Sequence, residues 1–288
     1  MNIFEVKFNR MNLRNILVAF LLGLLVGNVG GQPLKVVTYN IRYDNPGDGV
    51  NSWTSRRVWL CEQIRSANPD LFGIQEGLSQ QVKYFDSVFN GYRHVGVGRE
   101  DGKEKGEFSA IYYNANKIRC LNQGTFWLSS TPEKVSVGWD AVLERICTFG
   151  LFKDIESGRN FWVFNTHFDH IGVEARKNSA LLILKKIQTL DKQDYPVILM
   201  GDFNGPPDSD PIKIISQQLR DAKSADKSMS MLPDGTFNDF DSAKPVTERI
   251  DFIFTGKGAK AINYQVLRET KNGRFASDHF PVLAEISW

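Results

Sequence analysis

Short apolar runs, rich in β-branched and aromatic residues, alternate along this chain with longer patterns in which apolar residues recur every three or four positions. Runs of the first kind predict β-strands, and patterns of the second kind predict helices. Strands are expected at 35–39, 71–75, 92–97, 108–113, 145–152, 160–166, 197–200, 250–254 and 281–286, and helices at 55–67, 79–89, 174–190 and 210–219. In two of these helices the spacing counts Val58 and Leu181 among the core residues.

The order of these elements leaves the type of sheet open. Alternating strands and helices favour a parallel sheet with helices on both faces. The late strands, however, follow one another without helices, as in an antiparallel sheet, and no glycine-rich phosphate loop follows the first strand. Neither a repeat nor a linker interrupts Leu34 to Trp288, so the pattern alone predicts one domain of mixed α and β structure.

The first 31 residues have the pattern of a secretory signal peptide. Basic residues precede an apolar run at 16–26, and small residues follow it. The run is too short to cross a membrane comfortably. We therefore expect cleavage near Gly31 and a mature domain, residues 32–288, that is periplasmic or extracellular, monomeric and without a stable membrane span. An uncleaved amphipathic anchor is the alternative.

The charge balance argues against one class of partner. Residues 1–31 hold three basic residues and one acidic residue, so the 35 basic and 33 acidic residues of the whole chain become 32 of each without them. Tight nonspecific binding to long nucleic acids draws on excess Lys and Arg, which a neutral chain lacks, although a local basic groove stays compatible with it.

The three cysteines are Cys61, Cys120 and Cys147, with no CxxC pair. This number and spacing predict neither a disulfide framework nor a zinc site. Cys61 fits core packing, whereas Cys120 and Cys147 lie in strand-like runs and are candidates for a disulfide in an oxidising compartment.

Polar residues cluster where the apolar runs end. An acid after a strand is most often a turn former or a helix cap, but so many endings in one domain favour a site built at the ends of strands. The residues concerned are Asn40, Glu76, His167, Asp169, Asp202, Asn204, Asp251, Asp278 and His279.

The residue types restrict the chemistry of such a site. Several carboxylates repel one another unless a cation or shared protons compensate them. Carboxylate and amide oxygens without Cys suit a hard divalent ion, Mg²⁺ or Mn²⁺, which often binds phosphate oxygens as well. Asn and His can donate to a phosphate oxygen, and Asp can deprotonate a water. This inventory fits hydrolysis of a phosphate ester.

Six motifs resemble those of the endonuclease/exonuclease/phosphatase superfamily, whose fold is called DNase I-like. They occur in the family's order and span nearly all of the chain after residue 31: Thr38-Tyr-Asn40, Ile74-Gln-Glu76, Asn165-Thr-His167, Gly201-Asp-Phe-Asn204, Arg249-Ile-Asp251 and Ser277-Asp-His279. The resemblance implies a four-layer α/β sandwich of two largely antiparallel sheets flanked by helices.

The resemblance also implies a role for each matched residue. Glu76 is expected to be the main Mg²⁺ ligand, with Asp278 and Asn40 near the metal. Asp202 is expected to orient or activate the attacking water. The remaining roles are phosphate contact for Asn204 and His167, and a catalytic pair for His279 and Asp251.

Departures from the family's patterns bear on the substrate. Apurinic-type endonucleases carry an acid two residues after the first Asn, where this chain has Arg42, and their phosphate-facing Tyr is replaced by Phe108. Both differences weigh against DNA repair. The strand containing 126–129 is closer to nocturnin and the poly(A) deadenylases, and the chain is most similar to a secreted bacterial branch of the superfamily.

Other residues near the motifs are candidate substrate contacts. A turn-rich loop carries Trp53, Arg56 and Arg57. It fits either a rim that stacks on and clamps a substrate or a helix-capping loop in which Trp53 is packed. Arg42, Arg145 and Arg176 are further candidates. Residues 99–106 are expected to form a charged, solvated hairpin tip.

Three functional hypotheses follow. The leading one is a secreted, Mg²⁺-dependent phosphodiesterase or nuclease acting on nucleic acid or nucleotides. The second is a phosphatase or phosphodiesterase acting on a small phosphorylated sugar, inositol or lipid headgroup, which the neutral charge favours. The third, a noncatalytic binding module, is disfavoured because Glu76, Asp202, Asp278 and His279 are all present.

Overall fold

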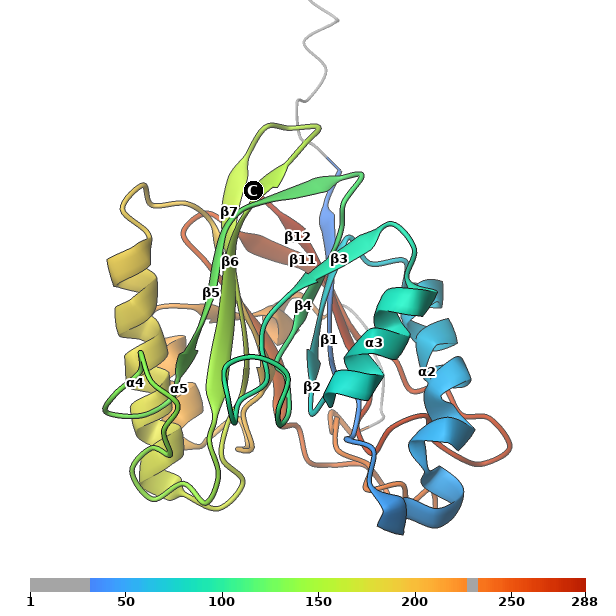
Figure 1. Ribbon diagram of the computed structural model, residues 1–288. Coiled ribbons are helices and arrows are strands. Elements are labelled where there is room, and N and C mark those ends of the chain that lie inside the picture. Colours follow the sequence, from blue (N-terminus) through green and yellow to red (C-terminus); the bar gives the residue numbers. More distant parts are fainter. Residues whose placement is uncertain (1–31, 227–232) are drawn as a thin grey trace, which may run out of the picture. The chain divides into compact units, whose positions relative to one another are not determined.

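The computed structural model describes residues 32–226 and 233–288, so the predicted signal peptide lies outside the described residues. Two six-stranded sheets pack face to face (Figure 1). The first has the strand order β11-β12-β1-β2-β4-β3 and the second the order β5-β6-β7-β8-β10-β9. In each sheet one central pair is parallel, β1 with β2 and β7 with β8, and the other pairs are antiparallel.

The elements have the following bounds. The strands are β1 (Leu34–Asn40), β2 (Leu71–Gln75), β3 (Tyr92–Val95), β4 (Ile111–Asn114), β5 (Ile118–Trp127), β6 (Ile146–Asp154), β7 (Asn160–His167), β8 (Val197–Asp202), β9 (Arg220–Asp221), β10 (Asp251–Gly256), β11 (Lys260–Val266) and β12 (Val282–Ser287). The helices are η1 (Pro46–Asn51), α2 (Trp53–Ala67), α3 (Ser79–Val88), α4 (Val173–Leu190), α5 (Asp210–Ser216) and η2 (Ala222–Ala225).

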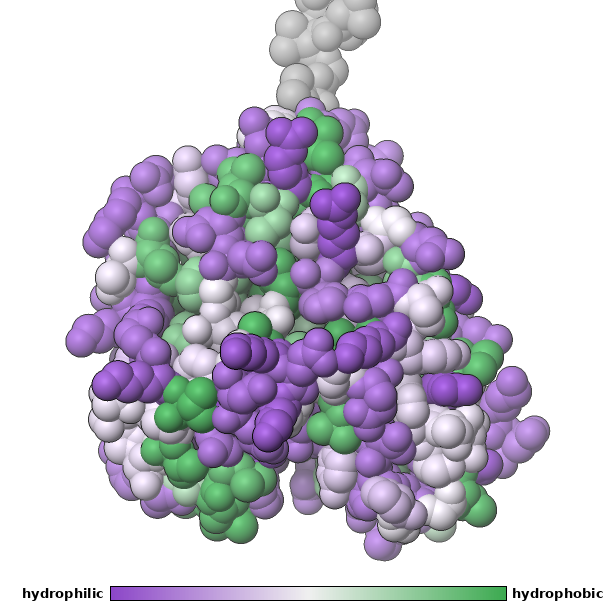
Figure 2. All heavy atoms as spheres, viewed as in Figure 1, coloured by the Kyte–Doolittle hydropathy of each residue, from purple (hydrophilic) through white to green (hydrophobic). Residues whose placement is uncertain are grey.

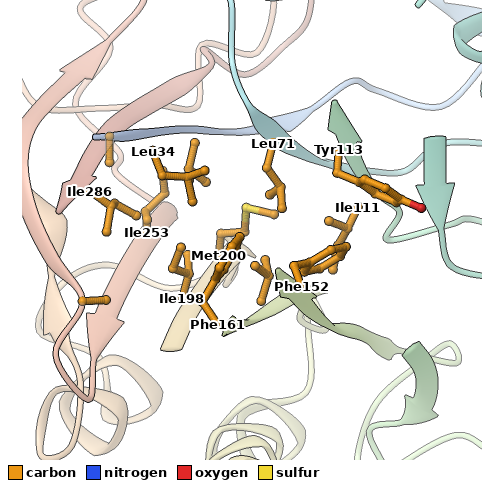
Figure 3. Close-up of a cluster of buried hydrophobic side chains, with 14 of the residues drawn as sticks. Leu34, Leu71, Ile111, Tyr113, Phe152, Phe161, Ile198, Met200, Ile253 and Ile286 are labelled. Atoms are coloured by element: carbon orange, nitrogen blue, oxygen red, sulfur yellow. The ribbon is translucent and has the colours of Figure 1, made fainter. Parts of the chain in front are cut away.

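Three apolar layers hold the sheets and helices together. The middle layer lies between the sheets, where Leu71 of β2 and Met200 of β8 point toward one another (Figure 3). A second layer joins β1 and β2 to α2 and α3, and a third joins β7, β8 and β10 to α4 and α5. Because strand side chains alternate between faces, each sheet buries both of its faces. The predicted four-layer α/β sandwich is thus confirmed.

All nine expected strands and all four expected helices are present, most of them with shifted ends, and the structure adds β5, β9 and β11. Strand β5 lies at the edge of its sheet and exposes Leu121, Asn122 and Gln123. A strand with an exposed, mixed face lacks the apolar run on which the prediction depended. Strand β11 is likewise an edge strand with alternating exposure.

Two expected core residues face solvent. Val58 is 58% exposed and Leu181 is 49% exposed. Both residues were expected in the core because they lie at spacings of three from other apolar residues. A helix turns once every 3.6 residues, so residues at successive spacings of three rotate away from the buried face. In α2 the buried face is instead formed by Trp53, Leu60 and Ile64.

All three cysteines are free. Cys120 lies opposite Phe152 and Cys147 lies opposite Phe126 in the β5–β6 ladder. The two thiols are therefore several residues apart along the strands, at roughly 3.3 Å per residue. A disulfide needs its Cα atoms within about 7 Å, so this register does not allow the pair.

No helix among residues 32–226 and 233–288 has the length and hydropathy needed to cross a membrane.

Candidate active site

The polar strand ends meet at one edge of the sandwich. The parallel pairs β1–β2 and β7–β8 end side by side, and β10 begins where β8 ends. The register pairs Asp202 with both His167 and Asp251 across three neighbouring strands. Strand pairing alone therefore places these three side chains together.

The backbone at these ends is unusual. Glu76, Asn204 and Arg42 have φ values of 64°, 47° and 55°. Non-glycine residues rarely adopt positive φ, and such residues gather at functional sites. Gly201 has φ 143°, and a Cβ there would lie 2.0 Å from the Thr166 carbonyl oxygen. The motif therefore needs glycine at this position, because β7 and β8 approach closely just before Asp202.

Asn40 joins the two sheets at the site. Its Nδ2 donates to Glu76 Oε1 and to Asp202 Oδ2, each at 3.0 Å. The second carboxylate oxygen of Glu76 accepts from the backbone N–H of Tyr43 at 3.0 Å. Ser277 Oγ donates to the Asn40 carbonyl oxygen at 2.7 Å, which ties β1 to the segment before Asp278.

His279 and Asp251 form a buried pair. His279 Nδ1 lies 2.8 Å from Asp251 Oδ2, and His279 Nε2 lies 3.8 Å from Asp202 Oδ2. Burial by itself lowers the pKa of His279, but the Asp251 carboxylate and the neighbouring acids outweigh it and raise the pKa to about 10. His279 is therefore positively charged at neutral pH, with Nε2 facing the centre of the site.

Asp202 has the properties of a general base. Burial raises the pKa of Asp202 to about 7, and the negative charge of Asp251 adds to this effect. A carboxylate whose pKa lies near the working pH accepts a proton well and is still ionised in part. Asn204 anchors the loop that follows, because its N–H donates to Asp202 Oδ1 at 2.9 Å.

His167 is neutral in this environment. Burial lowers its pKa well below the usual value, and the positive charges of Arg145 and Arg99 contribute next. Asn204 Nδ2 donates to the Phe168 carbonyl oxygen at 2.9 Å and lies 3.0 Å from His167 Nε2. An amide nitrogen can only donate, so His167 Nε2 accepts and its proton resides on Nδ1.

The residues expected to bind metal fit a hard divalent cation. Burial raises the pKa of Asp278 to about 6, and the negative charge of Glu76 raises it further against the pull of His279. Arg42 Nη1 stands 3.7 Å from Asp278 Oδ2, but that guanidinium is already paired with Asp48 at 3.0 Å. Close carboxylates with little compensating charge, together with an amide oxygen, are the ligand set that Mg²⁺ or Mn²⁺ prefers.

A second group, formed by Asp202, Asp251 and His279, also has ligand atoms close enough to hold a cation. Asp251 is fully buried and its Oδ2 is taken up by His279. Mg²⁺ usually keeps several waters. The partly exposed Glu76 therefore fits such an ion better than the buried group of Asp202, Asp251 and His279 does.

Three residues expected to bind substrate hold the structure around the site. Arg145 Nε donates to Asp169 Oδ1 at 3.2 Å, and Arg176 Nη1 donates to the Asp169 carbonyl oxygen at 3.0 Å. Arg42 pairs with Asp48 beside Asp278. The contacts of these three guanidinium groups therefore hold loops near the site.

Trp53 does not fit the role of a substrate-stacking residue. It is 3% exposed, and its ring packs on Phe85 at 6.1 Å and against Tyr84 at 5.8 Å. A ring buried in this way cannot stack on a substrate, so the packed alternative describes its position. Trp53 is the first residue of α2, so its packing fixes the point where the turn-rich loop meets this helix.

Arg56, expected in the same turn-rich loop as a residue that clamps a substrate, is buried and only 1% exposed. Its guanidinium donates to the carbonyl oxygens of Ile41, Arg42 and Ala276. It thus ties the end of β1 to the segment that carries Asp278. No local pattern marks this role, because its acceptors are backbone atoms.

Arg99 and Glu107 also lie near the site. The sequence predicts Arg99 at a solvated hairpin tip and indicates no role for Glu107. Arg99 is 6% exposed, and its Nη1 donates to Glu107 Oε2 at 2.6 Å. Glu107 Oε2 lies 3.8 Å from His167 Nδ1. The base of the hairpin therefore reaches the site, and only its tip, including Lys103 and Glu104, is exposed.

Comparison with known proteins agrees with this geometry. The model of the Endonuclease/Exonuclease/phosphatase family matches residues 37–279. A solved mannosyl-6-phosphatase from Bacteroides thetaiotaomicron is 38% identical, with a TM-score of 0.83 over 88% of this chain and all of that one. The human nocturnin catalytic domain is 20% identical, with a TM-score of 0.71 over 91% of this chain and 95% of that one, and shows the shared fold.

Curated relatives match over shorter stretches. A probable RNA exonuclease of Saccharomyces cerevisiae is 27% identical over 64% of this chain and 40% of its own length. The matches span between 30% and 67% of the length of the curated relatives. Because the family model covers most of the chain, this protein belongs to the Endonuclease/Exonuclease/phosphatase family, whose members are phosphoester hydrolases.

Proposed function

We propose that this protein is a divalent-metal-dependent hydrolase of small phosphorylated metabolites, with a sugar phosphate as the favoured substrate class. The proposed hydrolase activity rests on the hydrogen-bonded group of Asn40, Glu76 and Asp202. The His279–Asp251 pair lies beside this group. The substrate class rests on the similarity to the mannosyl-6-phosphatase along the whole of that chain, and on the equal numbers of acidic and basic residues after residue 31.

Each residue has a part in the proposed reaction. Glu76, Asp278 and Asn40 would hold Mg²⁺ or Mn²⁺, and the bound ion would offset the negative charge of the phosphate. Asp202 accepts a proton from the attacking water. His279, held in its charged form by Asp251, donates to the phosphate oxygens as negative charge develops.

The other expected substrate contacts belong to the same proposal. Asn204 and His167, which lie beside Asp202, contact the phosphate. Arg42, Arg145 and Arg176 supply positive charge around it. We also propose that the mature domain is residues 32–288, that it is exported after cleavage near Gly31, and that it acts as a monomer.

Phosphodiester hydrolysis on nucleic acid or nucleotides is the second candidate. The observation that favours it is the match to the probable yeast RNA exonuclease. The two candidates share one catalytic group and differ only in the substituents of the phosphate.

One experiment tests the proposal. The purified protein is supplied with Mg²⁺ and assayed on mannose 6-phosphate, p-nitrophenyl phosphate and bis(p-nitrophenyl) phosphate, each with and without EDTA. We expect EDTA-sensitive monoester hydrolysis, loss of at least about a hundredfold in Glu76→Gln and His279→Ala, and no loss in the exposed control Glu156→Gln.

Each other result has a definite meaning. Hydrolysis of the diester alone would replace the sugar phosphatase by the second candidate. A wild-type rate in His279→Ala would overturn the site assignment, and activity that survives EDTA would overturn the metal dependence.

A further inference from the structure

A buried guanidinium lies at the base of the hairpin between β3 and β4, next to the candidate active site. Arg99 bonds Glu107 at 2.6 Å, and Trp127 Nε1 donates to the Arg99 carbonyl oxygen at 2.7 Å. These contacts fix Arg99 between the two sheets, since Trp127 ends β5 of the second sheet and β3–β4 belong to the first. Hydrophilic side chains dominate the surface where this hairpin lies (Figure 1 and Figure 2).

A second buried guanidinium approaches from the other sheet. Arg145 is 5% exposed and immediately precedes β6. Its Nε donates to Asp169 Oδ1 at 3.2 Å, and its Nη2 lies 2.9 Å from His170 Nδ1. Arg99 Nη1 and His167 Nδ1 lie 2.6 and 3.8 Å from the same oxygen, Glu107 Oε2. The antiparallel β6–β7 register pairs Cys147 with Thr166, so Arg145 lies beside the end of β7 that carries His167.

Three buried nitrogens in this region have no hydrogen-bond partner among the described residues: Arg99 Nε, Arg145 Nη1 and His167 Nδ1. The first two are N–H donors in any state. The third is also a donor, because Asn204 occupies His167 Nε2. Buried donors are nearly always paired in folded proteins, so three of them together point to a bound group with several acceptor oxygens.

We propose that Arg99 and Arg145, with the Nδ1–H of His167, bind the terminal oxygens of a phosphomonoester and so select monoesters over diesters. This inference rests on the proposed function and specifies its substrate. A monoester phosphate has three terminal oxygens and up to two negative charges, whereas a diester has two such oxygens and one charge. Arg42 lies beside the expected metal ligand Asp278. Arg99 and Arg145 are additional guanidinium groups, and they complement the third oxygen and the second charge of a monoester.

Glu107 has a positioning role in this subsite. Burial raises its pKa, and the charge of Glu76 raises it further against the pull of Arg99. The Arg99–Glu107 bond orients the guanidinium and leaves its Nε free for the substrate. Asp169 does the same for Arg145 and leaves Nη1 free.

The test uses the full protein and compares Arg99→Gln and Arg145→Gln with Arg119→Gln, an exposed arginine on β5. We expect each buried substitution to lower kcat/KM for p-nitrophenyl phosphate by about ten- to a hundredfold, as loss of a charge-assisted hydrogen bond would. Inhibition by inorganic phosphate should weaken by a similar factor. Turnover of bis(p-nitrophenyl) phosphate should fall by a clearly smaller factor than monoester turnover, and Arg119→Gln should match wild type.

The controls separate the possible failures. Melting curves identify variants that do not fold, and for these Arg99→Lys and Arg145→Lys replace Gln, because Lys keeps the charge but loses the planar fork. If wild type hydrolyses no monoester, the proposed function fails. If wild type hydrolyses the monoester, two results would overturn the subsite. The buried variants could keep the wild-type inhibition by phosphate, or they could lose monoester and diester turnover equally. Either result would mean that waters accept the hydrogen bonds of these donors instead.

Discussion

Single residues at this site owe their chemistry to burial and to neighbouring charge. His279 and His167 are the same side chain, yet the pKa of one is raised to about 10 and the pKa of the other falls well below its usual value. Burial favours the neutral form of both. The difference is that His279 faces Asp251, whereas His167 lies among the charges of Arg145 and Arg99.

Asp251 is therefore expected to matter through His279. Asp251→Asn removes the charge that keeps His279 protonated while it retains a hydrogen-bonding side chain of the same size. We expect kcat to fall about a hundredfold or more, with a smaller change in KM, because His279 supports the reacting state more than it supports binding. Steady-state kinetics with the best monoester substrate measure both constants.

Asp208→Asn is the matched control, since Asp208 is exposed. It should behave like wild type. An Asp251→Asn protein that keeps more than about a third of the wild-type kcat would show that the pair is structural only.

At the scale of the elements, a buried asparagine adds to Asn40 a second polar link between the two sheets. Asn165 of β7 is fully buried, and its Nδ2 donates to the carbonyl oxygens of Ile74 and Ala110, each at 2.9 Å. Its Oδ1 accepts from Gln75 Nε2 at 2.7 Å. The asparagine before His167 in the family motif thus joins the second sheet to β2 and to the residue before β4, and it fixes the sheets at the level of the site.

Asn165→Leu should destabilise the fold. The substitution keeps the approximate volume but leaves Gln75 Nε2 and two carbonyl oxygens with fewer partners, at a cost of about 2–4 kcal/mol in the free energy of unfolding. Urea unfolding followed by tryptophan fluorescence measures this loss. Asn122→Leu, at an exposed position of β5, should change stability by less than about 0.5 kcal/mol. Equal stability of the two variants would contradict the inter-sheet role.

At the scale of the whole molecule, the site lies on segments that are distant in sequence. Asn40 and Asp202 bond across 162 residues, and Ser277 bonds the Asn40 carbonyl across 237. An ion held by Glu76, Asp278 and Asn40 would add a further link between such segments. A ligand that binds only the folded state stabilises it according to its concentration.

We therefore expect Mg²⁺ to raise the melting temperature. At about one hundred times its dissociation constant the ion should add about 2.7 kcal/mol to the free energy of unfolding. Thermal melts with a Mg²⁺ series, and with EDTA as the reference, give the shift without any substrate. Glu76→Gln should shift less than wild type at every Mg²⁺ concentration. An identical shift in this variant would place the ion elsewhere.

Several features could be predicted from the sequence alone. Apolar periodicity located the nine strands and four helices, because burial of a strand or helix face leaves a local record. The motifs named the family and the residue types of the site, since a cluster of carboxylates, amides and imidazoles has few chemical uses. Edge strands such as β5 were missed because half of their surface is solvated and keeps no apolar pattern.

Only the tertiary structure decided which side chains meet. It buried Trp53 under α3, brought Arg99 beside His167, and left donors there without partners among the described residues. It also separated Cys120 from Cys147 along one ladder. Sequence patterns record whether a residue prefers to be buried, but strand register and sheet packing set which buried groups face each other. The charge of His279 and the free N–H groups of the two arginines are properties of that arrangement.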